Sequence, residues 1–359
     1  LSKYEKGLSV PSLSVMNVLA ASLGVNVAYF YDTPSYKVQF HGFRKTSRLC
    51  KREQEKIQSL ISQLLEDRIP LQVCSETDWR FHLPIQSLPA HAGQDIENAA
   101  LKIREEWNLG RAPISSVVET LEENHVHVLE LDEQGHFDGL SATVEKDNET
   151  ISAAVVTRKM DCGERQRLTL LHELGHLVLQ PAEDQKENEH AAYRFASAFL
   201  IPEDELKNCV GVRRRKLAME ELILVKKRFG ISLQAILHRL KDLDIITERQ
   251  YRGWCISINQ LGWKKKEPAP LAKEDPQWLR RTVLKGYAEG WISQFKAEQM
   301  VGESMPSSDS ATLQKRRDFM KLPLDTRREI LEKQAHALAT HYNEDRDWRD
   351  MDEIDFIEY

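Results

Sequence analysis

The sequence predicts an α+β protein that is mainly helical and contains a small antiparallel sheet. Three observations lead to this fold class. Apolar residues recur at helical spacing in many segments, the clearest strand patterns lie between residues 125 and 158, and 41% of the 359 residues are apolar. A chain of this length and composition can bury more than one hydrophobic core. We therefore expect several domains.

The first two predicted domains cover residues 1–35 and 36–92. Residues 1–35 contain two short helical patterns, the first capped by Ser12 and the second by Asn26. Residues 36–92 predict a helical connector, with a helix over 51–66 and a less regular, proline-containing segment from 69 to 92. Neither stretch carries an evident catalytic motif.

The central predicted domain covers residues 93–205. Two helices separated by a turn at 110–113 come first, followed by a strand over 125–131 and a hairpin that turns at Asp147 and Asn148. A helical subdomain over 206–260 and a C-terminal helical region with an acidic tail over 261–359 complete the chain. The basic runs "VRRRK" and "KKK" are short, so we interpret these helices as structural.

Two histidines and a glutamate occur in the apolar stretch "QRLTLLHELGHLVLQ", residues 166–180. His172 and His176 are four residues apart, so a helix places both imidazoles on one face, and Glu173 lies about 100° round the axis. Two buried histidines and a buried glutamate would each need a polar partner if no metal were bound. This His-Glu-x-x-His pattern therefore predicts a zinc site.

A catalytic zinc ion needs a third protein ligand and an open position for water. The segment "ENEHAAYRFASAFLIP", residues 187–202, predicts a helix that follows the motif after a polar loop. Its spacing to the apolar face favours Glu189 as the third ligand, and Glu187 and His190 are the alternatives.

These two segments together closely resemble the ImmA/IrrE family of zinc metallopeptidases. The resemblance extends over most of residues 1–300 and includes "REEWNLGRAPI" at 104–114 and "VKKRFGISLQAILHRLKDLDIIT" at 225–247. It implies a zincin-like helix pair with Zn²⁺ as cofactor. It also implies metal ligands at His172, His176 and Glu189, with Glu173 as general base. Ala191 departs from the family pattern, in which a Glu or Gln often stands there.

The N-terminal stretch "SKYEKGLSVPSLSVMNVLAASLGV" resembles the second half of an Xre-type helix-turn-helix domain. Its first two helices and the start of its recognition helix would lie before Leu1. The residues that read the major groove lie at the start of that helix. We therefore expect this chain to bind DNA only when a complete helix-turn-helix is present.

Charge and composition exclude several classes of protein. The whole chain has a net charge of −6, and the last sixteen residues, with eight acids and two arginines, account for all of it. The rest of the chain is therefore neutral overall, which does not indicate a strongly basic protein that binds nucleic acid. No long uncharged apolar stretch and no secretory signal occurs, which predicts a cytoplasmic protein without membrane contacts. The five widely spaced cysteines do not indicate a disulfide framework.

The acidic tail, residues 344–359, interleaves its charges with apolar residues, of which Trp348, Phe356 and Tyr359 are candidate partner-binding residues. This mixture suits folding onto a basic groove. The tail is similar to antitoxin C-termini that cover ribonuclease toxins.

Two functions follow from these patterns. The first is a zinc endopeptidase that cleaves a regulatory protein, such as a repressor or an antitoxin. The second is a non-catalytic antitoxin or transcriptional regulator that binds a basic, PIN-like ribonuclease toxin through the tail. For the peptidase we expect the substrate to add as a strand beside residues 151–157, and a histidine or tyrosine to stabilise the oxyanion.

Overall fold

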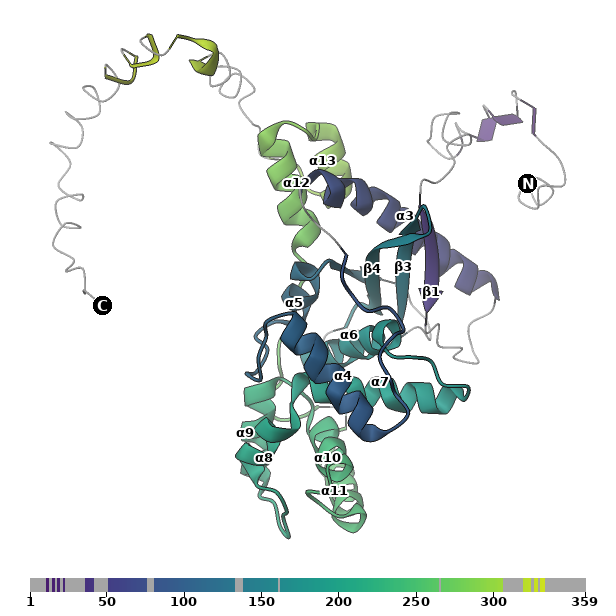
Figure 1. Cartoon of the computed structure of the whole chain (residues 1–359), viewed down its shortest axis with the longest axis vertical. Helices are drawn as coiled ribbons and strands as arrows, with labels where there is room; N and C mark the ends of the chain where they lie inside the picture. Colours follow the sequence, from purple (N-terminus) through teal and green to yellow (C-terminus); the bar gives the residue numbers. More distant parts are fainter. Residues whose placement is uncertain are drawn as a thin grey trace. The chain divides into compact units, whose positions relative to one another are not determined.

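The computed structural model describes residues 36–41, 51–75, 81–132, 138–160, 162–264 and 266–305, with scattered positions in 11–22 and 319–332 (Figure 1). The chain divides into two compact units, residues 1–282 and 283–359. Most of the expected partial helix-turn-helix and all of the acidic tail lie outside the described residues. Trp348, Phe356 and Tyr359 are among them.

One four-stranded sheet forms the centre of the first unit, in the order β1-β3-β4-β2. The strands are β1 (Lys37–His41), β2 (Val126–Leu131), β3 (Gly139–Lys146) and β4 (Glu149–Arg158). The pairs β1–β3 and β3–β4 are antiparallel, whereas β2 and β4 are parallel. The sheet is therefore mixed, which corrects the expectation of an antiparallel one. The reason is that β3 lies on the far side of β4 from β2, so β2 pairs with β4 instead of with the strand that follows it.

The sheet order also corrects the expected place of substrate addition. Residues 151–157 belong to β4, which is hydrogen-bonded to β3 on one side and to β2 on the other. An internal strand has no unpaired edge onto which an extended peptide could add. Among the described strands, only β1 and β2 lie at the edges of this sheet.

The predicted hairpin is confirmed. Asp147 and Asn148 join β3 to β4 with φ values of 52° and 66°. Two consecutive residues with positive φ are the signature of a type I′ turn, whose twist matches that of the flanking strands, and aspartate and asparagine tolerate this conformation.

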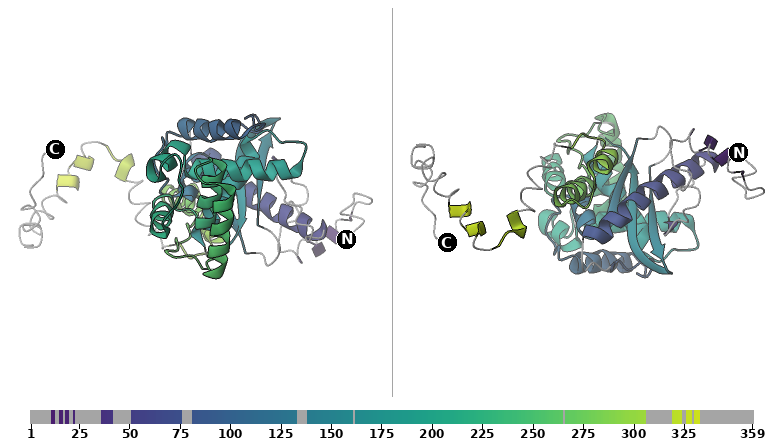
Figure 2. Two further views of the ribbon diagram at one scale, coloured as in Figure 1. Left: turned by 90° about the horizontal axis from the view of Figure 1, so that it is seen from below. Right: turned by 90° about the horizontal axis from the view of Figure 1, so that it is seen from above.

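The two faces of the sheet carry separate cores. Ala153 and Val155 face one core, and their neighbours Ala154 and Val156 face the other, as expected from the alternation of side chains along a strand. The long helix α3 (Lys51–Ser75) covers the second face (Figure 2). It continues well beyond the expected end at residue 66 and contains Pro70, and burial of Ile69 and Leu71 offsets the backbone hydrogen bond that this proline removes.

The other face is covered by helices of the central domain. After α3, the described helices that lie wholly within the first unit are α4 (Gly93–Glu106), α5 (Val117–Glu123), α6 (Gly163–Val178), α7 (Gln185–Leu200), α8 (Glu203–Val210), α9 (Met219–Phe229), α10 (Leu233–Asp242) and α11 (Glu248–Gln260). Helix α12 (Trp278–Glu289) begins at the end of that unit, and α13 (Gln294–Val301) belongs to the second. No described helix is long and apolar enough to cross a lipid bilayer.

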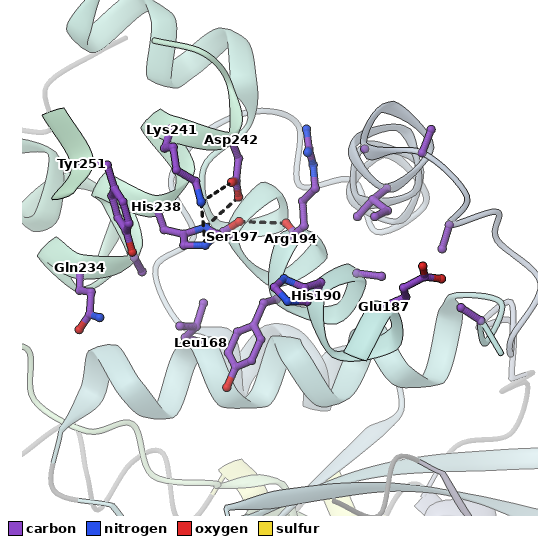
Figure 3. A pocket seen from close by; sticks show the side chains of 18 of the residues that line it. Leu168, Glu187, His190, Arg194, Ser197, Gln234, His238, Lys241, Asp242 and Tyr251 are labelled. Carbon is purple, nitrogen blue, oxygen red and sulfur yellow. Dashed lines mark hydrogen bonds and ion pairs between the residues drawn. The ribbon is translucent and has the colours of Figure 1, made fainter. Parts of the chain in front are cut away.

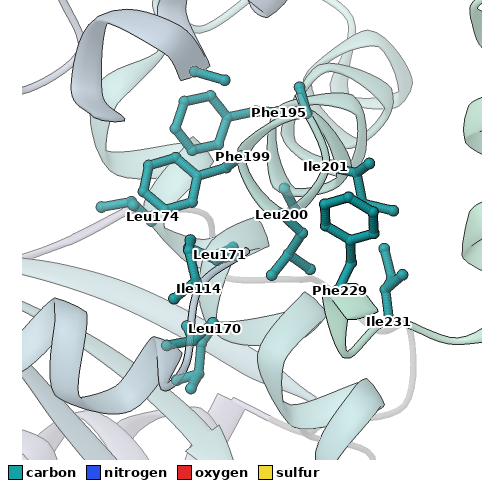
Figure 4. Close-up of a cluster of buried hydrophobic side chains, with 14 of the residues drawn as sticks. Ile114, Leu170, Leu171, Leu174, Phe195, Phe199, Leu200, Ile201, Phe229 and Ile231 are labelled. Atoms are coloured by element: carbon teal, nitrogen blue, oxygen red, sulfur yellow. The ribbon is translucent and has the colours of Figure 1, made fainter. Parts of the chain in front are cut away.

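Helices α6 and α7 pack closely against each other. Leu170, Leu171 and Leu174 lie in one buried cluster with Phe195 and Phe199, whose rings are stacked at 5.8 Å between centroids (Figure 4). A Cβ atom added at Gly175 would lie 3.1 Å from the Cα atom of Ala192. This glycine allows the two backbones to approach, and the approach sets the relative position of the polar residues on both helices.

A segment without helix or strand over residues 266–277, here called the strap, lies along the first half of α6. Gln166 accepts a hydrogen bond from the backbone N–H of Glu274 at 2.8 Å and donates one to its carbonyl oxygen at 2.7 Å. The Arg167 guanidinium pairs with the Glu274 carboxylate at 3.1 Å. These contacts fix the orientation of α6 about its own axis.

Candidate metal centre

The two motif histidines meet on one face of α6, as their spacing predicts. The Nε2 atoms of His172 and His176 lie 3.1 Å apart, and the rings are nearly perpendicular, with 4.6 Å between their centroids. The His172 side chain is 2% exposed and that of His176 is 10% exposed. Both imidazoles therefore present a nitrogen atom to one nearly buried point.

Helix α7 brings Glu189 to the same point. Its carboxylate oxygens lie 3.5 Å from His172 Nε2 and 3.7 Å from His176 Nε2. One donor atom from each of the three residues lies within 4.8 Å of the other two, the only such group of three metal-ligating side chains within the described part of the chain. The alternatives Glu187 and His190 line a different recess of the molecule.

The donor set fits a zinc ion. Two imidazole nitrogens and one carboxylate oxygen are a typical protein ligand set for catalytic zinc, with a fourth position open. Ligand atoms held at about 2.0–2.1 Å in tetrahedral directions are separated by about 3.4 Å. The two Nε2 atoms are 3.1 Å apart, and each lies 3.5 or 3.7 Å from a different carboxylate oxygen of Glu189, so the spacing of the donors suits a single ion.

Glu173 lies beside this group and is not part of it. Its side chain is 1% exposed and faces the start of β3, where a Cβ atom at Gly139 would lie 2.7 Å from Glu173 Oε1. A side chain at this position would push the carboxylate aside. The sheet therefore helps to hold Glu173 next to the two histidines, and the motif alone gave no indication of Gly139.

A small pocket of about 120 Å³ opens at the centre and includes His176, Glu189 and Gln86 in its lining. Gln86 adopts a left-handed backbone conformation, with φ of 45°, which is uncommon for a residue with a long side chain. Its amide nitrogen lies 3.2 Å from His41 Nδ1, and His41 Nε2 lies 2.8 Å from Thr143 Oγ1. Burial lowers the pKa of His41, opposed by the nearby charge of Glu145.

One further aromatic ring contacts the centre. Tyr193 follows Glu189 by one turn of α7, and its ring centroid lies 4.2 Å from that of His172. The sequence predicts a histidine or tyrosine near the reacting bond without naming it, and Tyr193 is the tyrosine that the fold brings to the histidine pair. Gln86 and Tyr193 were not predicted, because neither belongs to a metal-binding pattern.

Comparison with known proteins places part of the chain in a peptidase family. Residues 159–241 match the model of a peptidase family described as the IrrE N-terminal-like domain, which confirms the ImmA/IrrE assignment for this segment. The match contains α6 to α9 and nearly all of α10, and therefore all four motif residues. It does not reach the N-terminal stretch that resembles a helix-turn-helix. No curated protein matches the chain.

Proposed function

We propose that this chain, whose residues 159–241 belong to the IrrE N-terminal-like family, is a zinc-dependent endopeptidase that cleaves a regulatory protein. The observation that carries the proposal is the convergence of His172, His176 and Glu189 on one point beside the buried carboxylate of Glu173. Two imidazoles and one carboxylate from two helices, with a second carboxylate beside them, are the side chains that a catalytic zinc site needs. We further propose that the protein acts in the cytoplasm.

In this proposal His172, His176 and Glu189 hold the metal through two nitrogen atoms and one oxygen atom. When bound, a zinc ion polarises the scissile carbonyl group and lowers the pKa of water at its open position. The ligands themselves do not transfer protons. They fix the place at which water and the peptide bond meet.

Glu173 acts as the general base in this proposal. Its carboxylate accepts a proton from the attacking water, and the same carboxyl group then delivers that proton to the leaving amine nitrogen. The contact with Gly139 on one side and the packing of α6 on the other keep the carboxylate in one position. We propose that Tyr193, whose ring contacts that of His172, and Gln86, which lines the pocket at the metal centre, donate hydrogen bonds to a substrate carbonyl oxygen.

We propose a repressor or an antitoxin as the substrate, with cleavage switching a stress or mobile-element response. A second candidate function rests on the composition of residues 344–359, where eight acids are interleaved with Trp348, Phe356 and Tyr359. In that function the chain is an antitoxin or regulator, and the tail covers a basic, PIN-like ribonuclease toxin. The two functions are compatible in one chain.

The first function is tested by co-expression with the product of the adjacent gene and intact-mass analysis of both proteins. We expect cleavage by the zinc-loaded wild type and none by Glu173→Gln, which loses the base but keeps the ligands. Glu183→Gln is the matched control, an exposed acidic residue two positions before α7 begins, and should cleave like wild type. Undiminished cleavage by Glu173→Gln would assign the chemistry to another residue.

The second function is tested by removing residues 344–359. Neutralisation of a basic toxin should be lost, while zinc content stays unchanged. Acidic side chains set the on-rate and salt dependence of such a complex, and the aromatic residues act as anchors. A truncated protein that still retains the toxin at 0.5 M salt, where the Debye length falls to about 4 Å, would exclude a role for the tail.

A further inference from the structure

A recess of about 880 Å³ adjoins the candidate metal centre along α7. Ala191 lines both this recess and the small pocket that contains His176 and Glu189. Tyr193 also lines the recess, while its ring contacts that of His172. The recess and the metal centre are therefore neighbours, and side chains of α7 form the boundary between them.

The walls of the recess come from several helices (Figure 3). Leu168 belongs to α6, one turn before His172, and Ala235 and His238 belong to α10. The start of α4 and Tyr251 of α11 complete the wall, and both lie outside the segment that matches the peptidase family. The shape of the recess is thus set partly by residues that the family domain does not supply.

The charged groups of the recess largely neutralise one another. Asp242 lies 2.9 Å from His238 Nδ1 and 3.6 Å from Lys241 Nζ. Burial disfavours the ionised form of Asp242, but His238, Lys241 and Arg194 together hold its pKa below the ordinary value. Burial also raises the pKa of Tyr251 to about 12, helped by Cys255, so its hydroxyl group stays neutral.

The remaining cation of the wall also has a partner. The Arg194 guanidinium lies 3.1 Å from the carboxylate of Glu97, which is buried at 4% exposure. Glu187, His190 and His91 are exposed to solvent. A ligand in the recess would therefore meet no uncompensated buried charge, and a strongly charged ligand would lose hydration without gaining a partner.

The uncharged part of the wall is mainly apolar and aromatic. It includes Ile96, Leu168, Ala191, Ala235 and the rings of Tyr193 and Tyr251, and its polar members are Ser197, Ser232 and Gln234. The volume lies within the range of about 300–1,000 Å³ that is usual for ligand sites, whereas the pocket at the metal centre is far smaller. The recess can thus hold a large side chain together with part of the adjacent peptide backbone.

We infer that this recess is the specificity pocket of the peptidase and binds an aromatic or large aliphatic side chain flanking the scissile bond. The inference rests on the proposed function. In this arrangement the peptide passes over Tyr193, with the bond to be cut at the metal centre and the neighbouring side chain in the recess. Gln234, exposed at the start of α10, is available to the peptide backbone.

Peptide binding tests the inference without requiring cleavage. A random displayed peptide library is selected on the full-length, zinc-loaded Glu173→Gln variant, and the affinities of recovered peptides are measured by fluorescence polarisation. We expect enrichment of aromatic or large aliphatic residues. Ala235→Trp, which fills the recess, should weaken binding about tenfold or more, because the peptide side chain loses its apolar site.

Two further variants control this experiment. Leu224→Trp places the same large side chain at an exposed position of α9 outside the recess, and should change affinity less than twofold. Tyr251→Ala enlarges the recess and should shift the selected peptides towards larger residues. Zinc content should stay at the parent level in all three variants, which separates loss of the recess from loss of the metal centre.

Two results would overturn the inference. One is a selection that yields no binding peptides, and the other is a set of peptides whose affinity Ala235→Trp leaves unchanged. Peptides that bind in the recess but are not cut by the wild-type protein would support the recess as a peptide site and count against the proposed peptidase activity. The two failures are therefore distinguishable.

Discussion

The two halves of α6 bury polar side chains in different ways. In the first half Glu164, Gln166 and Arg167 are each at most 3% exposed, and all three contact the strap. In the second half His172 and Glu173 are as deeply buried, but His172 lies among three metal-ligating side chains. Burial of polar groups is common to both halves. What distinguishes the candidate site is that metal-ligating atoms from two helices converge on one point.

The polar contacts of the first half of α6 are expected to stabilise the folded protein. Lys226, at 2% exposure, pairs with both Glu164 and Glu267. Lys226→Met would leave two carboxylates in a largely buried position without their cation, and breaking such a pair costs about 3–5 kcal/mol of unfolding free energy. Denaturant unfolding of the metal-free protein measures this, with Arg252→Met as the control, since its ion pair is exposed and worth about 1 kcal/mol or less. Equal losses in both variants would remove the assigned role of the first half.

The polar residues of the second half of α6 are expected to contribute to the proposed peptidase activity. Gly139→Ala would place a Cβ atom 2.7 Å from Glu173 Oε1 and displace the general base. A displacement of about 1 Å can lower kcat about 100-fold, so we expect that loss with unchanged zinc content. The matched control is Gly253→Ala, where an added Cβ atom meets nothing within 4 Å. Full activity of Gly139→Ala on a cleaved peptide would contradict the assigned role of Glu173.

His127, on strand β2, is a third buried polar group that can be compared with the two halves of α6. Burial lowers the pKa of His127 well below 6.5, and the charges of Arg68 and His125 add to the effect. Its Nε2 atom bonds to Gln72 Oε1 at 2.9 Å, and its ring lies against Trp278. His127 lines neither the recess nor the pocket at the metal centre, so we assign it a structural role.

The pH dependence of stability tests that role. Below about pH 6.5 the unfolded chain protonates this histidine while the folded chain does not, so the unfolding free energy falls as pH decreases. The slope from one such group reaches about 1.4 kcal/mol per pH unit. We expect His127→Gln to show a smaller fall between pH 7 and 5.5 in urea unfolding. A fall as steep as in wild type would show that His127 is not held neutral.

The sequence predicted the residues whose spacing is local. His172 and His176 share a helical face at any position in a fold, and the apolar spacing of α7 was enough to favour Glu189 over Glu187 and His190. The hairpin at Asp147 and Asn148 was predictable for the same reason, because turn chemistry depends on adjacent residues.

Contacts that join distant segments were not predictable. Nothing near Gly139 in the sequence indicates that Glu173 will lie against it, and Gln86 reaches the metal pocket because its backbone N–H bonds to the carbonyl oxygen of Leu177. The sheet order was not predicted, because β2 pairs with β4 and not with β3, the next strand in the sequence. The stretch "REEWNLGRAPI", part of the family resemblance, contains Arg104, which has a structural role. Its guanidinium group donates hydrogen bonds to the carbonyl oxygens of Gly110 and Phe199.

The metal content of the folded protein tests the central claim most directly. After dialysis, elemental analysis should find about one zinc ion per chain in wild type and in Glu187→Gln. His176→Ala and Glu189→Ala should lose most of it, because each removes one of the three converging donors. Wild-type protein without zinc, or zinc retained equally in all four proteins, would contradict a metal centre formed by His172, His176 and Glu189.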